Sequence, residues 1–323
     1  MTAAQGESGD QEVLAQVSRR WQALDPVLPD PSFPIAAGGE RFTAGPPGAP
    51  TAVAGCGHWI GEAGTLELCW GTAQRFGLTA RVAGPDVGGA LDELLSAWHD
   101  HLTAQDGLDL DDPDTSVNLS WPSRDVAGVR ALVRHGLQPM AVVAVRTGRA
   151  ALGEGGDLPP GVRIRRAAPA DLEAVIGLEH EVVRYDANFG QVIDRPWTTD
   201  ALRQEAAPAL AADEPWVWLA ERDGRPVGVL HAQRPADAGW IAGLTARAPV
   251  AYNLLTGVSP TERGGGIGAA LTARFHTEAA AAGVAVTLLH HTVTNPRSVP
   301  FWSQQGYRPL WTIWEISPAS TLR

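Results

Sequence analysis

A glycine-rich loop in the second half of the chain, Arg263-Gly264-Gly265-Gly266-Ile267-Gly268, has the composition of an anion-binding site. Glycine permits positive backbone φ angles and leaves the backbone amides open to a phosphate group. The loop follows an apolar segment and precedes a helical pattern, and the first amides of a helix have no partner within it and favour an anion. Arg263 adds a permanent positive charge with planar donors. The loop therefore predicts a diphosphate-binding site.

Other phosphate-binding motifs fit this loop less well. A nucleotide P-loop ends in Gly-Lys followed by Ser or Thr, whereas this loop ends in Ile267-Gly268-Ala269 and the chain contains no lysine. A dinucleotide-binding fingerprint requires an acidic residue about 20 residues further on, where Leu288 and Leu289 stand. The remaining alternative is a tight turn whose glycines serve packing only.

The segments around the loop predict the elements that must position it. Strands are predicted at residues 162–165, 216–220, 227–231, 252–258, 284–290 and 311–316. Helices are predicted from Pro169 onward, at 268–282 and at 296–305. Asp223-Gly224 is typical of a hairpin turn between the second and third strands. Hairpins followed by a strand–helix–strand unit predict a mixed sheet.

Two segments carry a resemblance to a known family. Val258–Leu271 resembles motif A of the GNAT superfamily of N-acetyltransferases, in which Arg or Gln, two residues, Gly, one residue and Gly or Ala follow a strand. Asn295–Tyr307 resembles motif B, with its asparagine, its aromatic pair Phe301-Trp302 and its Gly-aromatic ending. With the order of the elements, the resemblance covers residues 160–316. It implies an α+β (α/β) fold, a mixed and mostly antiparallel sheet flanked by helices, and acetyl-CoA as cosubstrate.

The resemblance also implies a role for each part of the two motifs. The loop amides would hold the pyrophosphate of the cofactor, and the residues concerned are Arg263, Gly264, Gly265, Gly266, Ile267, Gly268 and Ala269. The strand residues Thr256, Gly257 and Val258 would splay from the neighbouring strand and pair with the pantetheine arm. The Val258 amide would polarise the thioester carbonyl and stabilise the oxyanion. Asn295 would hydrogen-bond the arm, and Phe301 and Trp302 would belong to the same site.

One residue departs from the family pattern. The second residue of the aromatic pair is often a tyrosine that protonates the leaving thiolate, and here it is Trp302. An indole N–H donates a hydrogen bond but does not release a proton near neutral pH. Either the thiolate leaves unassisted, or another group serves, or the domain catalyses poorly. Tyr307 is close in sequence, although a tyrosine after glycine at this place also fits a structural role.

The base that deprotonates an incoming amine has several candidates. His290 and His291 end the strand beside the expected site, and a histidine of near-neutral pKa suits the task. Strand alternation places only one of the two on the side of the cleft. Glu181 at the end of the first helix is a further candidate, His231 ends the returning strand of the hairpin, and a water molecule could also relay the proton. Trp197 and Trp240 lie in less regular segments and are candidates for an acceptor pocket.

The first half of the chain repeats the order of the second. Strands are predicted at residues 51–59, 65–70, 78–82, 116–121 and 140–145, and helices around Val13–Trp21, at 89–102 and at 125–135. His135-Gly136-Leu137-Gln138-Pro139 parallels Gln305-Gly306-Tyr307-Arg308-Pro309, which sets Asp125 opposite Asn295. A glycine- and proline-rich linker near residues 153–160 separates the halves. We therefore expect two tandem GNAT-like domains, residues 1–158 and 159–323.

The first copy is predicted to be degenerate. Its equivalent of the loop, Val82–Leu91, contains glycines but no arginine, and Asp86 would repel a phosphate. Residues 1–160 hold 10 arginines against 20 acidic residues, whereas residues 161–323 hold 15 against 16. An acidic half argues against nucleic acid as a partner. The near-neutral second half is the better place for an anionic cofactor.

Composition limits the remaining possibilities. Two cysteines, Cys56 and Cys69, do not make a disulfide framework, and with His58 they lack a fourth metal ligand, so no metal is expected. The chain has no long apolar run and no basic, apolar leader at Met1–Asp10, so we expect a cytoplasmic protein without a membrane partner. A monomer or a homodimer is expected.

The leading hypothesis is transfer of an acetyl group from acetyl-CoA to a primary amine of a small molecule. Direct attack in a ternary complex is expected, because residues 159–323 contain no cysteine to carry an acyl group. Two alternatives stay open, a regulatory protein that binds acyl-CoA without turnover and an enzyme that acetylates an amine of a protein or peptide. A broad groove would favour the latter, and binding without thiol release the former.

Overall fold

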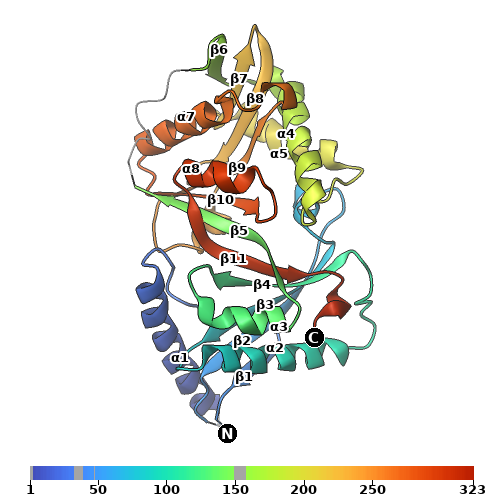
Figure 1. Cartoon of the computed structure of the whole chain (residues 1–323), viewed down its shortest axis with the longest axis vertical. Coiled ribbons are helices and arrows are strands. Elements are labelled where there is room, and N and C mark those ends of the chain that lie inside the picture. Colours follow the sequence, from blue (N-terminus) through green and yellow to red (C-terminus); the bar gives the residue numbers. More distant parts are fainter. Residues whose placement is uncertain (1–2, 33–38, 47, 149–157) are drawn as a thin grey trace.

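A computed structural model describes residues 3–32, 39–46, 48–148 and 158–323 of the chain. Its centre is one 11-stranded sheet in the order β1-β2-β3-β4-β11-β5-β10-β9-β8-β7-β6, with helices on both faces (Figure 1). The strands are β1 (Arg41–Ala44), β2 (Ala52–Ile60), β3 (Gln74–Val82), β4 (Thr115–Pro122), β5 (Gln138–Thr147), β6 (Val162–Arg166), β7 (Val217–Arg222), β8 (Arg225–Gln233), β9 (Val250–Val258), β10 (Val286–Thr292) and β11 (Arg308–Ile316).

The helices cover the sheet from both sides. They are α1 (Ala3–Leu24), α2 (Val87–Thr103), α3 (Val129–Arg134), α4 (Leu172–Asp186), α5 (Thr198–Ala211), α6 (Gly239–Ala242), α7 (Ile267–Ala281) and α8 (Ser298–Gln304). Neighbouring residues on a strand point to opposite faces. Val217 packs with residues of α4 and α5, whereas Trp218 packs with α7. Helices α4 and α5 therefore lie on one face of the sheet and α7 on the other.

The predicted fold class is confirmed, because the sheet is mixed, mostly antiparallel and flanked by helices. The predicted strand at residues 65–70 is wrong, since this segment is a 3-10 turn, η1 (Leu66–Trp70). Its apolar residues pack against the second half of the chain, where Cys69 Sγ lies 3.4 Å from Thr198 Oγ1. Sequence reasoning also missed β1, α5 and α6, which are short or rich in alanine. The predicted linker near 153–160 lies mostly outside the described residues.

The last strands of the two halves cross over in the sheet. β11 lies between β4 and β5, and β5 lies between β11 and β10, with all three contacts antiparallel (Figure 1). Each half also contains one parallel pair joined through a helix, β3 with β4 through α2 and β9 with β10 through α7. The strand that completes the sheet of one half is thus supplied by the other.

Helix α1 anchors the centre of this shared sheet. Val13, Val17 and Trp21 recur at four-residue spacing and are buried, as predicted for one face of a helix. They pack with residues of β5, β10 and β11 in a single apolar cluster. Trp21 meets Trp311 of β11 edge to face, with ring centroids 5.1 Å apart. The amino-terminal helix therefore packs on strands from both halves.

Strands β9 and β10 separate before they end. Their parallel pairing runs only from Val250 with Val286 to Asn253 with Leu289, although β9 continues to Val258 and β10 to Thr292. In β9, the register with β8 also shifts at Leu254, which is the mark of a β-bulge. The predicted splaying of the strand that ends at Val258 is confirmed, and it opens a gap in the sheet at the loop.

Arg195, in the segment before α5, joins the second half to the first. Its guanidinium donates two hydrogen bonds of 2.7 Å to Asp114 and further bonds to the carbonyls of Leu68 and Gly71, with 13% of its side chain exposed. The charged hydrogen bonds also hold the pKa of Asp114 below its usual value, despite partial burial.

Among the helices that the structure describes, none combines the length and the apolar composition needed to span a membrane.

Replacing Arg195 by lysine should destabilise the protein by about 2 kcal/mol, because an ammonium group cannot form the paired bonds to Asp114 and still reach both carbonyls. Urea unfolding measures the loss. Arg203→Lys is the matched control, because Arg203 pairs with Glu173 at the surface and its replacement should change stability little. Equal losses for the two variants would contradict the bridging role of Arg195.

Candidate active site

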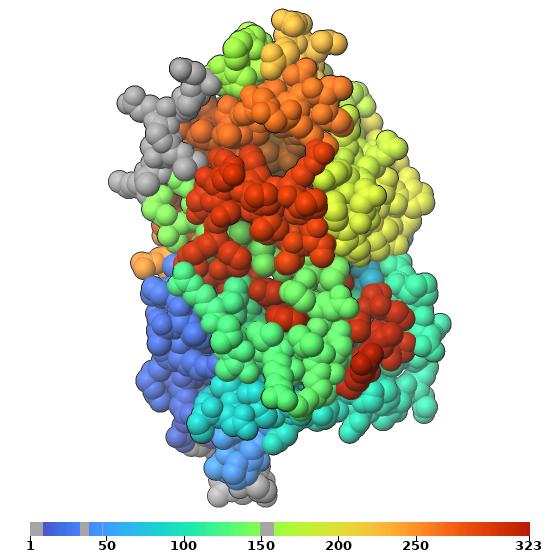
Figure 2. Space-filling view, in the orientation of Figure 1, coloured from blue at the N-terminus to red at the C-terminus, as the bar shows by residue number. Residues whose placement is uncertain are grey.

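A cavity of about 1300 Å³ lies where β9 and β10 separate. On one side it is lined by the end of β9, the glycine loop, the start of α7, α8 and the end of α4. On the other side it is lined by β10, α6, β11 and residues of the first half from η1, β3 and β4. Figure 2 shows the surface hollowed between α7, in orange, and α8, in red. The cavity thus connects the loop to the junction of the two halves.

The glycine loop leaves the start of α7 open. Gly264 and Gly266 adopt φ angles of +81° and +84°, which side-chain-bearing residues rarely adopt. Gly266 is the N-cap of α7, and among the described residues no side chain accepts a hydrogen bond from the first amides of the helix. A Cβ atom at Gly264 would meet nothing within 4 Å. These amides and this space fit the pyrophosphate of a coenzyme A molecule.

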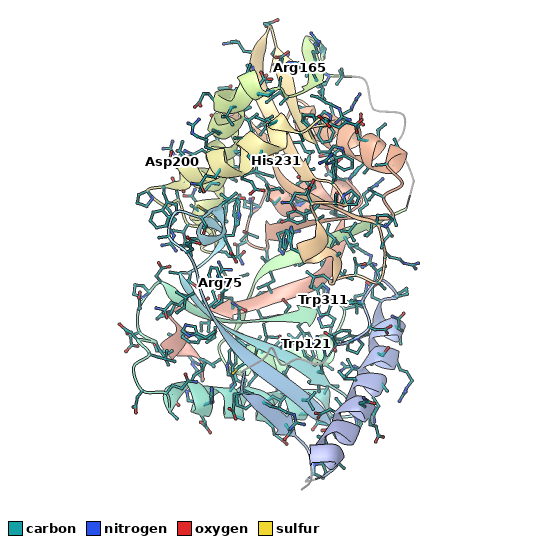
Figure 3. All side chains as sticks on the ribbon, turned by 180° about the vertical axis from the view of Figure 1, so that it is seen from behind. Arg75, Trp121, Arg165, Asp200, His231 and Trp311 are labelled. Atoms are coloured by element: carbon teal, nitrogen blue, oxygen red, sulfur yellow. The ribbon has the colours of Figure 1, made fainter. Side chains whose placement is uncertain are left out.

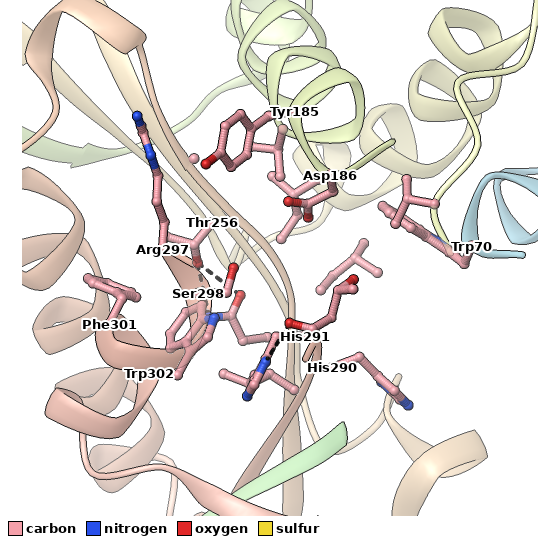
Figure 4. A pocket seen from close by; sticks show the side chains of 18 of the residues that line it. Trp70, Tyr185, Asp186, Thr256, His290, His291, Arg297, Ser298, Phe301 and Trp302 are labelled. Carbon is pink, nitrogen blue, oxygen red and sulfur yellow. Dashed lines mark hydrogen bonds between the residues drawn. The ribbon is translucent and has the colours of Figure 1, made fainter. Parts of the chain in front are cut away.

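Two arginines and a tyrosine border the loop. Arg263 Nε donates a 2.9 Å hydrogen bond to the carbonyl of Val258, which fixes the turn between β9 and the loop. The guanidinium groups of Arg263 and Arg297 lie 5.1 Å and 5.0 Å from the ring of Tyr185 on α4. Figure 4 shows the end of the Arg297 side chain beside the ring of Tyr185. The guanidinium groups of Arg263 and Arg297 therefore lie beside the loop that is predicted to bind phosphate.

Asp186, the last residue of α4, lies in the cavity lining next to these cations. Asn295 Nδ2 donates a 2.7 Å hydrogen bond to its carboxylate, and Asn295 Oδ1 accepts from the amides of Arg297 and Ser298 at the start of α8. Burial raises the pKa of Asp186 to about 6, against the lowering by Asn295 and Arg263. Asn295 thus positions both α8 and Asp186, and its predicted bond to the cofactor arm stays a prediction.

Both histidines at the end of β10 line the cavity, whereas one had been expected there. His290 Nδ1 shares a 2.9 Å hydrogen bond with the hydroxyl of Tyr252, and its ring is stacked parallel to that of Trp240 at 6.3 Å. Burial and the neighbouring His291 lower the pKa of His290 to about 4. Burial also lowers the pKa of His291. The gap between β9 and β10 opens both faces of β10 to one cavity.

The other predicted bases lie elsewhere. Glu181 lies outside the cavity lining, one helical turn before the lining residue Tyr185 on α4. One of its carboxylate oxygens is buried without a hydrogen-bond partner among the described residues. His231 is buried with Glu179 in a 2.8 Å contact, and both side chains are 1% exposed (Figure 3). Burial acts to lower the pKa of His231, but the Glu179 charge outweighs it and leaves the pKa raised. We interpret this pair as structural.

The aromatic pair of α8 lines the cavity near the glycine loop. Phe301 and Trp302 both line the cavity, with ring centroids 4.7 Å apart (Figure 4). A Cβ atom at Gly268 would come within 3.3 Å of Phe301, so glycine allows α7 and α8 this close approach. Tyr307 is buried below them and its hydroxyl bonds His276 Nε2 at 3.0 Å. Tyr307 is therefore held in the core and not in the cavity.

The first half fills its equivalent place with its own side chains. Asp86 is the N-cap of α2, and its carboxylate accepts a 2.9 Å hydrogen bond from the amide of Gly89. Arg20 of α1 pairs with Asp125 and donates to the carbonyl of Val82. The anion site of α2 is thus occupied by a carboxylate of the same chain. A phosphate at this helix terminus would have to displace the Asp86 carboxylate.

Most of the predicted site residues come together around the cavity. Its lining includes Thr256, Gly257, Val258, Arg263, Gly264, Gly266, Ile267, Gly268, Ala269, His290, His291, Phe301 and Trp302. Gly265, Asn295 and Glu181 lie outside the lining, and so does Trp197, whereas Trp240 belongs to it. Sequence reasoning missed the lining residues Tyr185, Asp186, Arg297 and Glu315. Their contacts depend on the end of α4 and on the exchanged strand, which no local motif encodes.

Within the described ranges, no group of three or more His, Cys, Asp or Glu side chains is placed to hold a metal ion. The open start of α7 beside Arg263 suits an anionic ligand. Residues 184–307 match the family model described as the acetyltransferase (GNAT) family. This part of the chain is therefore similar to the GNAT acetyltransferases.

Similar proteins agree with this family. A mycothiol acetyltransferase of Thermobispora bispora is 29% identical over 167 residues, which are 49% of this chain and 50% of that protein. The chain thus aligns with about half the length of this relative. A GCN5-related N-acetyltransferase of Sphaerobacter thermophilus has the same fold, with a TM-score of 0.56 and 16% identity over 95% of this chain and 91% of its own. A glucosamine N-acetyltransferase region of a fungal multi-domain enzyme covers 84% of this chain and 32% of its own, with a TM-score of 0.50 and 13% identity.

Replacing Asp186 by asparagine should stabilise the protein more at pH 8 than at pH 5. A carboxyl group with a raised native pKa contributes its stability at low pH and loses it as the pH rises through that pKa, here about 6. The asparagine variant does not ionise, so its advantage over the wild type should grow by roughly 1.4 kcal/mol between these two pH values. Urea unfolding at both pH values measures this difference, and an advantage independent of pH would contradict it.

Proposed function

We propose that the protein transfers an acetyl group from acetyl-CoA to a primary amine of a small molecule. The observation that carries the proposal is the cavity. Through the gap between β9 and β10 it joins the uncapped start of α7 to an acceptor chamber lined by Glu67, Glu205 and Glu315. An anionic cofactor fits one end of this cavity and a cationic amine the other. A mycothiol acetyltransferase among the similar proteins adds support for a small acceptor.

In this proposal, some residues of the chain bind acetyl-CoA and others polarise its thioester carbonyl. The amides at the start of α7, with Arg263 and Arg297, would hold the pyrophosphate. Acetyl-CoA supplies an acetyl group activated as a thioester. The Val258 amide would donate to the thioester carbonyl and stabilise the developing oxyanion. The acceptor amine would attack directly in a ternary complex. Trp302 offers an indole N–H toward the leaving thiolate, which can depart without a proton because thiols are acidic.

We propose His291 as the group that takes the proton of the amine. Its neighbour His290 has a pKa of about 4 and shares a hydrogen bond with Tyr252, so it is a weak base at neutral pH. His291 lines the same cavity, and its Nδ1 atom lies 3.3 Å from the carbonyl of Thr292. A water molecule held by His291 would serve the same purpose.

The first half has a structural role in this proposal. We propose that residues 1–158 and 159–323 are two copies of one unit, and that the first copy has lost its cofactor site to Asp86 and to the Arg20–Asp125 pair. It would contribute a wall of the acceptor chamber. A cytoplasmic location and a monomeric or homodimeric state belong to the same proposal.

A regulatory protein that only binds acyl-CoA is the second candidate. The absence of a tyrosine at Trp302 and the low pKa of His290 favour it. Calorimetry with acetyl-CoA followed by a thiol-release assay across a set of amines separates the two functions. Binding together with amine-dependent release supports the enzyme, whereas binding with no release on any amine supports the regulator.

Replacing Arg263 by alanine should raise the KM for acetyl-CoA roughly tenfold, because a charged contact to the phosphates and the bond to Val258 are both lost. Gly266→Glu should abolish binding, because it places a negative side chain at a positive-φ position of the anion site. Thiol release and calorimetry measure both effects. Gly283→Ala is the matched control, because Gly283 has a φ of +72° beyond the end of α7 with nothing within 4 Å. Unchanged acetyl-CoA binding in both loop variants would refute this assignment of the site.

Replacing His291 by glutamine should lower kcat/KM for the amine by roughly 100-fold near neutral pH, as expected when a general base is lost. His290→Gln is the neighbouring control and should cost much less. The KM for acetyl-CoA should stay the same in both variants. If the two substitutions lower the rate equally, His291 is not the specific base and a water molecule replaces it in the proposal.

A further inference from the structure

Glu315, near the end of the exchanged strand β11, is a buried carboxylate that faces the cavity. It is 8% exposed and belongs to the lining. Within the part of the chain that the structure describes, no hydrogen bond or ion pair reaches its carboxylate. Burial raises the pKa of Glu315 to about 7, and the positive charge of Arg75 on β3 lowers it only in part. The Glu315 oxygens are not among the fully enclosed polar atoms and face the cavity, so a molecule in the cavity can supply the donors that the carboxylate lacks.

Arg75 is committed to other partners. Its guanidinium donates to the carbonyls of Thr72 and Glu67 at 3.2 Å and 3.1 Å and lies 4.1 Å from the ring centre of Trp59. Figure 3 shows Arg75 at the level where the two halves meet. Its charge therefore acts on Glu315 from a distance, while the donors that a carboxylate needs are left to a bound molecule.

The sheet fixes how far Glu315 lies from the gap between β9 and β10. Ile313, two residues before Glu315, is in register with Ala141 of β5, which is in register with Thr292 of β10. Residues two apart on a strand share a face, so the side chain of Glu315 lies on the same face as that of Thr292. Two strand spacings separate β11 from β10, which gives about 10 Å.

The rest of this chamber suits a cation with an apolar body. Glu67 and Glu205 also line it, so the acceptor end holds three carboxylates, with Glu315, against the one engaged guanidinium of Arg75. Trp70 and Ile313 supply apolar surface. Trp240 is 61% exposed and presents its ring at the same end. An ammonium group joined to the reactive amine by an apolar chain complements this lining.

Building on the proposed function, we propose that Glu315 binds a second ammonium group of the acceptor, so that the preferred substrates are extended diamines. One amine would lie at the gap near Val258 and accept the acetyl group, and the other would donate charge-assisted hydrogen bonds to Glu315. The second amine supplies the donors that the carboxylate lacks. It therefore selects the substrate and takes no part in the chemical step.

Matched α,ω-diaminoalkanes and monoaminoalkanes of increasing length test the proposal in a thiol-release assay with the full chain and acetyl-CoA. The lowest KM should fall on long diamines whose nitrogens lie at least about 10 Å apart, because two strand spacings separate β11 from β10 and the gap lies beyond β10. Glu315→Gln keeps the shape of the side chain and should raise the KM for these diamines by about 10- to 100-fold, with kcat and the monoamine KM unchanged. Glu12→Gln is the control for the loss of one negative charge, because Glu12 is exposed on α1.

The outcomes separate this inference from the proposed function. Equal KM values for diamines and monoamines, or a diamine KM that Glu315→Gln does not raise, would overturn the role of Glu315 while leaving the acetyltransferase in place. If no amine releases the thiol, the acetyltransferase proposal fails. Calorimetry with the best-fitting diamine then still decides the role of Glu315, since the wild type should bind it about tenfold or more tightly than Glu315→Gln. A melting curve checks that the variant is folded.

Discussion

The antiparallel pairing of β5 with β11 is the contact on which the rest of the structure depends. It joins two sets of strands into one sheet and places the last strand of each half against the other half. Backbone hydrogen bonds in the middle of a sheet cannot be lost without exposing two edges. This pairing also forms one wall of the acceptor chamber. The wall consists of Ile313 and Glu315 on β11 and of Asn118 and Ser120 on β4.

The starts of helices α2 and α7 differ in what accepts hydrogen bonds from their first amides. The start of α2 is capped by the Asp86 carboxylate, whereas the start of α7 has no side-chain cap. A glycine N-cap such as Gly266 is less favourable than an aspartate N-cap by only a few tenths of a kcal/mol. The second half keeps this less stable arrangement together with Arg263 and the positive-φ glycines beside it. The contrast explains how one fold supports a packed scaffold and an anion site in the same chain.

Sequence reasoning predicted the local features of this site and missed those that depend on distant pairing. The glycine loop could be predicted, because Arg263 to Gly268 combine a backbone requirement with a helix start within a few residues. The strand prediction at residues 65–70 was wrong, because its apolar side chains serve a contact with the segment around Thr198. The base could not be assigned, because the burial that lowers the pKa of His290 comes from α6 and Tyr252. The sequence around Glu315 does not indicate that it lines the cavity, because its position depends on the pairing of β11 with β4 and β5.

The crossing of the last strands has a consequence for how the chain folds during synthesis. When a ribosome has made residues 1–300, the first half still lacks β11, so the edge of β4 and the apolar residues beneath Trp314 have no cover. Contacts between residues so far apart in the sequence form slowly, and exposed strand edges favour aggregation. The first half therefore reaches its final form only after the second is almost complete, which makes maturation of this protein a single late event and a point at which chaperones would act.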